Sequence, residues 1–217
     1  MRLALLGPPG SGKGTQAARI CDAFGLEHLA SGDILRAEKA AGSPMGLQVR
    51  GYLDAGQLVP DELMLQVMRE KIRSLQQGFI LDGFPRTLPQ AEELNRILVE
   101  LQKPLELVLN FVAGRAALLE RFSGRRICPL CHTVYHVVSA PPKVAGVCDL
   151  DGHALEQRPD DRSEVVARRI ATYEETTEPL VAFYAKSTTV RMVDTGGSIE
   201  EASKMVLAEI RRHFGLK

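Results

Sequence analysis

A glycine-rich segment near the N-terminus has the residue types that bind nucleotide phosphates. Residues 7–13 read Gly-Pro-Pro-Gly-Ser-Gly-Lys, which fits the pattern G-x-x-x-x-G-K. Glycines allow the backbone to curl until its N–H groups point inward, and Lys13 adds a mobile positive charge. The helix expected next directs the positive end of its dipole at the same phosphates. An ordinary strand-to-helix turn is the alternative, but the order of strand, loop and helix favours a nucleotide site.

The residue after the lysine departs from this pattern. A serine or threonine usually follows the lysine and holds Mg²⁺, whereas here Gly14 follows and Thr15 comes one position later. The sequence Gly-Lys-Gly-Thr is similar to the loops of nucleoside monophosphate kinases. The displaced hydroxyl argues against direct Mg²⁺ ligation by the loop.

A second group of residues has the spacing of a metal site. The pattern C-x₂-C-x₁₆-C-x₂-D is made by Cys128, Cys131, Cys148 and Asp151. Two such knuckles present four ligands to a tetrahedral Zn²⁺, and a carboxylate is an acceptable zinc ligand. The histidines at positions 132, 136 and 153 remain alternatives to the aspartate. A site closed by four ligands has no place for substrate, so we expect it to stabilise its segment rather than to do chemistry.

The elements that must position these residues follow from apolar periodicity. Short apolar runs at residues 3–6, 26–30, 78–81, 105–111 and 190–193 predict buried strands, and helical patterns lie between them. The helices are expected at residues 14–24, 61–74, 88–101, 115–122, 161–184 and 199–214. Alternating strands and helices predict an α/β fold: a doubly wound, five-stranded parallel sheet of the P-loop type.

Two segments differ in composition from this core. Residues 30–59 are poor in large apolar residues and predict a helical flap, with Ser31 as a helix N-cap and a flexible connector over residues 40–46. Residues 122–161 carry the cysteine pattern and one strand at residues 133–138, and predict a small lid. The core domain is expected to comprise residues 1–29, 60–121 and 162–217. Glycine-rich borders suggest that flap and lid close over bound nucleotides and expel water.

Composition limits the class of protein. The 217 residues carry 27 basic and 27 acidic side chains, and this zero net charge disfavours a protein that coats nucleic acid. No segment has the apolar length of a membrane-spanning helix or of a signal peptide. Clustered cysteines fit a reducing compartment better than a disulfide framework, so we expect a cytoplasmic protein, with Cys21 as a small core residue. No apolar surface stripe suggests obligate dimerisation, and we expect a monomer.

One further motif identifies a family. Residues 82–86 read Asp-Gly-Phe-Pro-Arg and are followed by Gln90. Together with residues 7–15, the Ser-Gly-Asp of residues 31–33, the Gly-Arg-Arg of residues 124–126 and the Asp-Asp of residues 160–161, this motif resembles the bacterial long-lid adenylate kinases over essentially the whole chain. The resemblance implies the reaction ATP + AMP ⇌ 2 ADP, with ATP, AMP and ADP as its small-molecule partners. Some lid-bearing members of the family carry a structural zinc.

The implied reaction explains why no Ser-His-Asp set is needed. Its nucleophile is a phosphate oxygen that is already ionised, so catalysis depends on alignment and on neutralising charge, for which arginine is suited. Singly, an arginine is more typical of a solvated surface. Asp160 and Asp161 are expected to orient arginines or to anchor the lid rather than to act as bases, and Asp82 to order water around Mg²⁺ near Thr15. The catalytic set that the resemblance implies is Lys13, Arg86, Arg121, Arg125, Arg158 and Arg169.

The resemblance also implies two sets of binding residues. ATP is expected to contact Gly10, Ser11, Gly12, Lys13, Gly14, Thr15, Arg121, Val134, Tyr135 and Gly197. AMP is expected to contact Ser31, Arg36, Gln57, Leu58, Val59, Gly83, Phe84, Pro85, Arg86, Gln90, Arg158 and Arg169. The amide of Gln90 both donates and accepts hydrogen bonds, which suits the edge of adenine. A kinase for GMP, UMP or CMP is the nearest alternative, and a P-loop switch whose cysteine knuckles contact nucleic acid is a more distant one.

Overall fold

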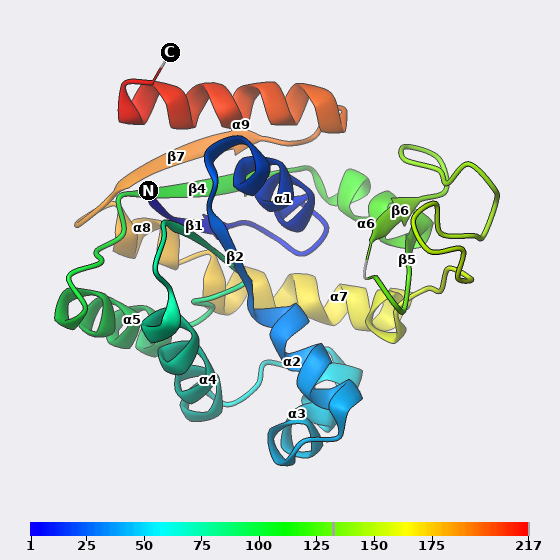
Figure 1. The fold of residues 1–217 in the computed structure, drawn as a ribbon, viewed down its shortest axis with the longest axis horizontal. Helices are drawn as coiled ribbons and strands as arrows, with labels where there is room; N and C mark the ends of the chain where they lie inside the picture. Colours follow the sequence, from blue (N-terminus) through cyan, green and yellow to red (C-terminus); the bar gives the residue numbers. More distant parts are fainter. Residues whose placement is uncertain (132, 217) are drawn as a thin grey trace.

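The structure is a computed structural model that describes residues 1–131 and 133–216, and its centre is one parallel sheet (Figure 1). The strand order is β2-β3-β1-β4-β7, and all neighbouring pairs are parallel. The strands are β1 (Arg2–Leu6), β2 (Glu27–Ala30), β3 (Phe79–Asp82), β4 (Leu107–Val112) and β7 (Thr189–Asp194). The five-stranded parallel sheet predicted from the apolar runs is therefore confirmed.

Helices cover both faces of the sheet because its central strands are apolar on both sides. Leu3 and Leu5 of β1 pack in the cluster formed by α1 (Lys13–Phe24) and α9 (Ile199–Phe214). Ala4 and Leu6 point to the opposite face, where the cluster includes residues of α4 (Asp61–Ser74), α5 (Leu88–Glu100) and α8 (Leu180–Tyr184). Figure 1 shows α9 above the sheet and α5 and α8 below it. Among the described residues, no helix combines the length and apolarity needed to span a membrane.

The flap consists of α2 (Ser31–Ala41) and α3 (Pro44–Ala55), which lie at the bottom of Figure 1. The connector predicted over residues 40–46 is wrong in extent, because only Gly42 and Ser43 lie between the helices. Ser43 caps α3 by accepting a hydrogen bond from the Gly46 N–H at 2.9 Å. Gly46 packs so closely on α2 that an added Cβ would lie 2.0 Å from the carbonyl oxygen of Glu38. The two helices are thus packed directly against each other.

The lid follows α6 (Arg115–Gly124) and contains the antiparallel strands β5 (Arg125–Ile127) and β6 (Val134–His136). Strand β6 is shorter than the strand predicted at residues 133–138. The lid has a small core of its own, formed by Cys128, Tyr135 and Cys148 with Leu155 packed against them. The burial of so few apolar side chains contributes little stability, so a bound metal ion would add substantially to the stability of the lid.

The single helix predicted over residues 161–184 is interrupted. A 3₁₀ turn (Pro159–Asp161) precedes α7 (Ser163–Thr172), and a π-helical turn (Tyr173–Thr177) separates α7 from α8. The prediction that Ser31 caps a helix is also wrong. Ser31 is the first residue of α2, and its hydroxyl donates to the carbonyl oxygen of Gly83 at 2.7 Å. That bond ties the start of the flap to the loop after β3.

Candidate functional site

A cleft of about 800 Å³ opens where the strands end, as expected for ligand sites of doubly wound sheets. Its lining comes from the loop after β1, the end of β3, the flap, the lid and α7. Among the described residues, the lysine and arginine side chains that line it are those of Lys13, Arg19, Arg36, Arg86, Arg121, Arg125, Arg158 and Arg169. The carboxylates in the lining are those of Asp33, Asp82 and Asp160. The excess of positive charge suits a polyanionic ligand.

The loop at residues 7–12 has the backbone conformation that its glycines permit. Gly7, Gly10 and Gly12 have φ values of 137°, 82° and 89°, which side-chain-bearing residues rarely adopt. At Gly10 an added Cβ would also lie 2.8 Å from the ring of Phe122. The Nζ of Lys13 donates to the carbonyl oxygens of residues 7 and 8 at 2.8 and 2.9 Å. The lysine is thus folded back over its own loop, at the N-terminus of α1.

The pKa of Lys13 is lowered from 10.5 to about 8. Burial is the largest cause, since it penalises the charged ammonium, and the positive charges of Arg86, Arg169 and Arg125 lower the pKa further. The carboxylate of Asp82 opposes these effects without cancelling them. A bound polyanion would supply the negative charge needed to stabilise the ammonium form of this lysine.

Two aspartates hold the arginines that lie between lid and core. Arg125 donates to both carboxylate oxygens of Asp161, with Nε at 2.7 Å from Oδ2. Arg169 donates to Oδ2 of Asp160 at 2.8 Å, and both guanidinium groups lie over the ring of Phe122, at 4.8 and 5.2 Å from its centroid. Asp160 and Asp161 therefore orient arginines, as expected from the sequence. Burial lowers the pKa of Arg169 only to about 10, so the guanidinium stays charged at neutral pH.

The flap contributes a second cationic group to the cleft. Arg36 donates to Oδ1 of Asp33 at 2.5 Å, and Nη2 of Arg158 lies 3.6 Å from the same oxygen. Arg86 donates through Nε to the carbonyl oxygen of Gly83 at 2.7 Å. Burial lowers the pKa of Arg158 to about 10. Asp33 therefore contacts both Arg36 of the flap and Arg158, which follows the two lid strands in the sequence.

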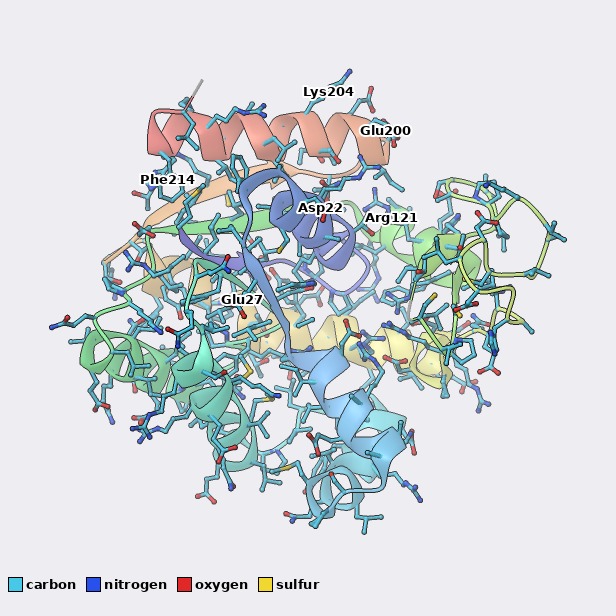
Figure 2. The ribbon with its side chains drawn as sticks, in the orientation of Figure 1. Asp22, Glu27, Arg121, Glu200, Lys204 and Phe214 are labelled. Atoms are coloured by element: carbon cyan, nitrogen blue, oxygen red, sulfur yellow. The ribbon has the colours of Figure 1, made fainter. Side chains whose placement is uncertain are left out.

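Arg121, labelled in Figure 2, also lines the cleft. It reaches from α6 to the carbonyl oxygens of Gly10 at 3.3 Å and Gly197 at 3.2 Å, and it also donates to that of Thr195. It therefore bridges the loop before α1 and the loop before α9. Gly197 itself is absent from the cleft lining among the described residues.

The structure brings together most residues that the sequence assigned to nucleotides. The ATP-side set lines the cleft except for Gly197, and the AMP-side set lines it except for Phe84. Phe84 is 1% exposed and packs in the core below the sheet, so its side chain supports the motif from behind. Leu58 and Val59 reach the cleft from the segment that joins α3 to α4.

The four predicted metal ligands also come together. One ligand atom from each of Cys128, Cys131, Cys148 and Asp151 lies within 4.8 Å of all the others. Asp151 Oδ2 is 3.1 Å from Cys128 Sγ, and the sulfurs of Cys131 and Cys148 are 3.5 Å apart. This compact donor set could hold one metal ion.

Among the described histidines, neither His136 nor His153 belongs to this set. His153 Nδ1 lies 3.4 Å from Asp151 Oδ1, so its ring contacts a ligand from outside, whereas the ring of His136 packs on Gly124. His132, the third alternative ligand, lies outside the described residues.

Several residues in or beside the cleft were not identified from the sequence. His28 Nε2 lies 3.3 Å from Asp82 Oδ2, and Thr177 reaches the cleft from the π-helical turn. Asp61 contacts Gln90 from α4. No local pattern marks these residues, because each meets its partner only through the fold.

Comparison with known proteins identifies relatives over nearly the whole chain. The family model described as "Adenylate kinase" matches residues 5–189. A curated adenylate kinase from Citrifermentans bemidjiense is 46% identical over 213 residues, which cover 97% of this chain and 100% of the relative. One from Geobacillus sp. is 44% identical over 217 residues, 99% of each chain. One from Bacillus subtilis is 45% identical over 188 residues, 86% of this chain and 87% of the relative.

Proposed function

The chain belongs to the adenylate kinase family and catalyses ATP + AMP ⇌ 2 ADP, and we propose that its cleft binds ATP beside residues 10–15 and AMP beside the flap. The observation that carries the proposal is the convergence of lysine and arginine side chains from loop, flap, lid and α7 on one cleft. Two nucleotides aligned there present a continuous chain of phosphates, which such a set of cations neutralises.

On the AMP side, Arg36 and Arg86 bind the α-phosphate, which supplies the attacking oxygen. Both line the cleft near Ser31, whose hydrogen bond to Gly83 joins flap and core. Gln90, which is 2% exposed and lines the same cleft, recognises the base. Backbone groups of residues 57–59 complete this half of the site.

On the ATP side, the backbone N–H groups of residues 10–15 surround the β- and γ-phosphates. Lys13 releases the carbonyl oxygens that it contacts and moves onto these phosphates. Arg121 holds the loop from α6, and residues 134, 135 and 197 border the adenosine. Arg125, Arg158 and Arg169 meet at the junction of the two nucleotides. An arginine that stabilises the transition state of phosphoryl transfer can contribute roughly 10³–10⁵ in rate.

Mg²⁺ accompanies ATP in this family, and Asp82 is the residue placed to orient its water shell. The carboxylate of Asp82 lines the cleft and lies 3.5 Å from the ideal Cβ position of Gly14, at the start of α1. Thr15 also lines the cleft. When bound with ATP, Mg²⁺ would supply positive charge that offsets the negative charge developing on the phosphates, with its water shell oriented by Asp82.

The cysteine cluster of the lid would hold a structural Zn²⁺ through Cys128, Cys131, Cys148 and Asp151. Two thiolates about 2.3 Å from a tetrahedral zinc ion would lie about 3.7 Å apart, close to the 3.5 Å between the sulfurs of Cys131 and Cys148. Three thiolates and one carboxylate fill all four positions, which leaves none for a nucleotide. The ion acts as part of the lid core.

We propose that the flap and the lid are separate domains that close over the core. The flap at residues 30–59 and the lid at residues 122–161 close over the core and exclude water from the phosphoryl group. Energy transfer between dyes at Arg50 and Lys143, both exposed, tests this motion. The dyes should approach each other when a bisubstrate inhibitor binds, and an unchanged transfer efficiency would count against closure.

We also expect a cytoplasmic monomer without nucleic-acid or membrane partners, in keeping with its zero net charge. Sedimentation over a range of concentrations tests the monomer, and a gel-shift assay at physiological salt tests the lack of nucleic-acid binding.

Substrate profiling tests the proposed base selection. ADP formation is measured with ATP and each of AMP, GMP, UMP and CMP, using Lys13→Ala as the inactive variant. Lys71→Ala, an exposed lysine on α4, serves as the matched control. AMP should be the preferred acceptor, and only Lys13→Ala should lose activity. Preference for another monophosphate would contradict the assignment of Gln90.

A further inference from the structure

The side chain of Gln90 is held at both ends by residues from other parts of the fold. Its Oε1 accepts a hydrogen bond from the backbone N–H of Arg86 at 2.8 Å. Its Nε2 donates to Oδ1 of Asp61, at the start of α4, at 2.7 Å. Gln90 therefore uses one acceptor position and one donor position inside the protein.

These two partners permit only one orientation of the Gln90 amide. A backbone N–H can only donate, and an ionised carboxylate can only accept. If the amide rotated by half a turn, its NH₂ group would face the N–H of Arg86 and its oxygen would face the carboxylate of Asp61. Both contacts would then be repulsive, at a site where burial makes unpaired polar groups expensive.

Neighbouring hydroxyls fix the two partners in turn. Thr87 donates from Oγ1 to Oδ2 of Asp61 at 2.8 Å, and it accepts from the backbone N–H of Gln90 as the N-cap of α5. Thr177 donates to the carbonyl oxygen of Arg86 at 2.8 Å from the π-helical turn. The network thus joins α4, α5, the loop after β3 and the π-helical turn around one amide.

The orientation determines which base edge Gln90 can bind. One N–H and one oxygen lone pair of the amide remain free, and Gln90 lines the cleft. On its Watson–Crick edge, adenine offers an amino donor beside a ring-nitrogen acceptor, which matches the free oxygen and the free N–H. On the same edge, guanine offers an oxygen acceptor where adenine has the amino group, and a protonated ring nitrogen beside it. Guanine would need the rotated amide, which both Asp61 and the backbone N–H of Arg86 disfavour.

We infer that Asp61 is a positioning residue that fixes the amide of Gln90 in the orientation selective for adenine over guanine. Asp61 acts through Gln90. The inference rests on the proposed AMP site and adds a residue that determines its specificity.

The ratio of kcat/KM for AMP to that for GMP tests this role. In Asp61→Asn the side chain keeps its shape but can present an NH₂ group to the oxygen of a rotated Gln90 amide. We expect the ratio to fall by about tenfold or more, the range for one oriented pair of base contacts. The fall should come from a higher KM for AMP and a higher kcat/KM for GMP, with a smaller change in kcat for AMP.

Glu62→Gln is the matched control because it removes the same charge from the same turn of α4. Glu62 is exposed and does not belong to the described lining of the cleft. Its ratio should stay within about twofold of the parent chain. Thermal unfolding of each variant separates selectivity from stability. If Asp61→Asn does not fold, Asp61→Ser, which suits a helix start but is too short to reach Gln90, should show the same fall.

An unchanged ratio in a folded, AMP-active Asp61 variant would overturn the inference, because a purely structural role would lower stability without altering base choice. Failure of the parent chain to use AMP would instead overturn the proposed function. The two failures are therefore distinguishable.

Discussion

Binding of ATP should draw a proton onto Lys13 at alkaline pH. In the ligand-free protein, burial and neighbouring arginines lower the pKa of this lysine to about 8. The phosphates of ATP bring negative charge to the same loop and raise the lysine pKa towards or above its ordinary value. The complex then binds more protons than the free protein from about one pH unit below the free lysine pKa upwards, so proton uptake accompanies binding and ATP affinity falls as the pH rises.

The size of the effect follows from the lowered pKa. With a pKa of about 8, Lys13 is about 90% charged near pH 7, about 50% near pH 8 and about 10% near pH 9. If ATP binding restores the full charge, uptake amounts to about 0.1, 0.5 and 0.9 protons at these pH values. Between the lysine pKa of the free protein and that of the complex, ATP affinity should fall by up to about tenfold per pH unit.

Isothermal titration calorimetry in buffers of different ionisation enthalpy measures this uptake directly. The titrations use ATP without AMP, so that no transfer occurs, and are repeated with Lys13→Met, which removes the titrating group and keeps the apolar stem. The pH-dependent uptake should disappear in Lys13→Met. Equal uptake in the two proteins, or proton release by the parent chain above pH 8, would refute the reasoning about Lys13.

Three further perturbations test how the flap, the lid and the arginine network are held. Cys128→Ser should lower the thermal unfolding temperature of the lid, and a chelator should do the same to the parent chain. Turnover near room temperature should largely survive both changes. Complete loss of turnover in a folded variant would refute a purely structural metal. Gly46→Ala should destabilise the flap by about 1–3 kcal/mol and raise KM for AMP, because the new Cβ meets the backbone of α2. Gly51→Ala, in open space on the same helix, should be neutral or stabilising. Equal KM values for AMP in the two variants would contradict this packing. Asp161→Ala should lower the free energy of unfolding by about 3–5 kcal/mol and also reduce kcat, because Arg125 loses its buried partner. An unchanged kcat would show that Asp161 does not position Arg125 for catalysis.

The regular parts of the fold could be predicted because their signals are local. Each apolar run is short and bounded by polar or turn residues, and the runs became the five strands of the sheet. The helices at residues 61–74 and 199–214 were predicted with the bounds found in the structure. The cysteine spacing likewise needed only a compact lid to bring its ligands together.

The errors arose where tertiary contacts override local propensity. Residues 40–46 read as a flexible connector, yet Gly46 lies inside a helix, where its close packing against the backbone of Glu38 requires a residue without a side chain. The continuous helical pattern after residue 161 concealed the π-helical turn that brings Thr177 to Arg86. Such features depend on contacts between distant segments, which periodicity does not encode.

The same reason explains what was missed in the site. Asp61 reads as the first acidic residue of a helix, and its contact with Gln90 spans 29 positions. The arginines could be proposed only through family resemblance, since a guanidinium has no spacing rule of its own. Their gathering in one cleft is information that the fold supplies.

Transfer of a labelled γ-phosphoryl group from ATP to AMP tests the central claim most directly. Two nucleotides bound in one water-excluding cleft should pass the label to the β-position of ADP, with two ADP formed for each AMP consumed and little inorganic phosphate released. Transfer should be lost in Lys13→Ala. Release of the label as inorganic phosphate regardless of AMP, or its retention in ATP when AMP is present, would contradict the account.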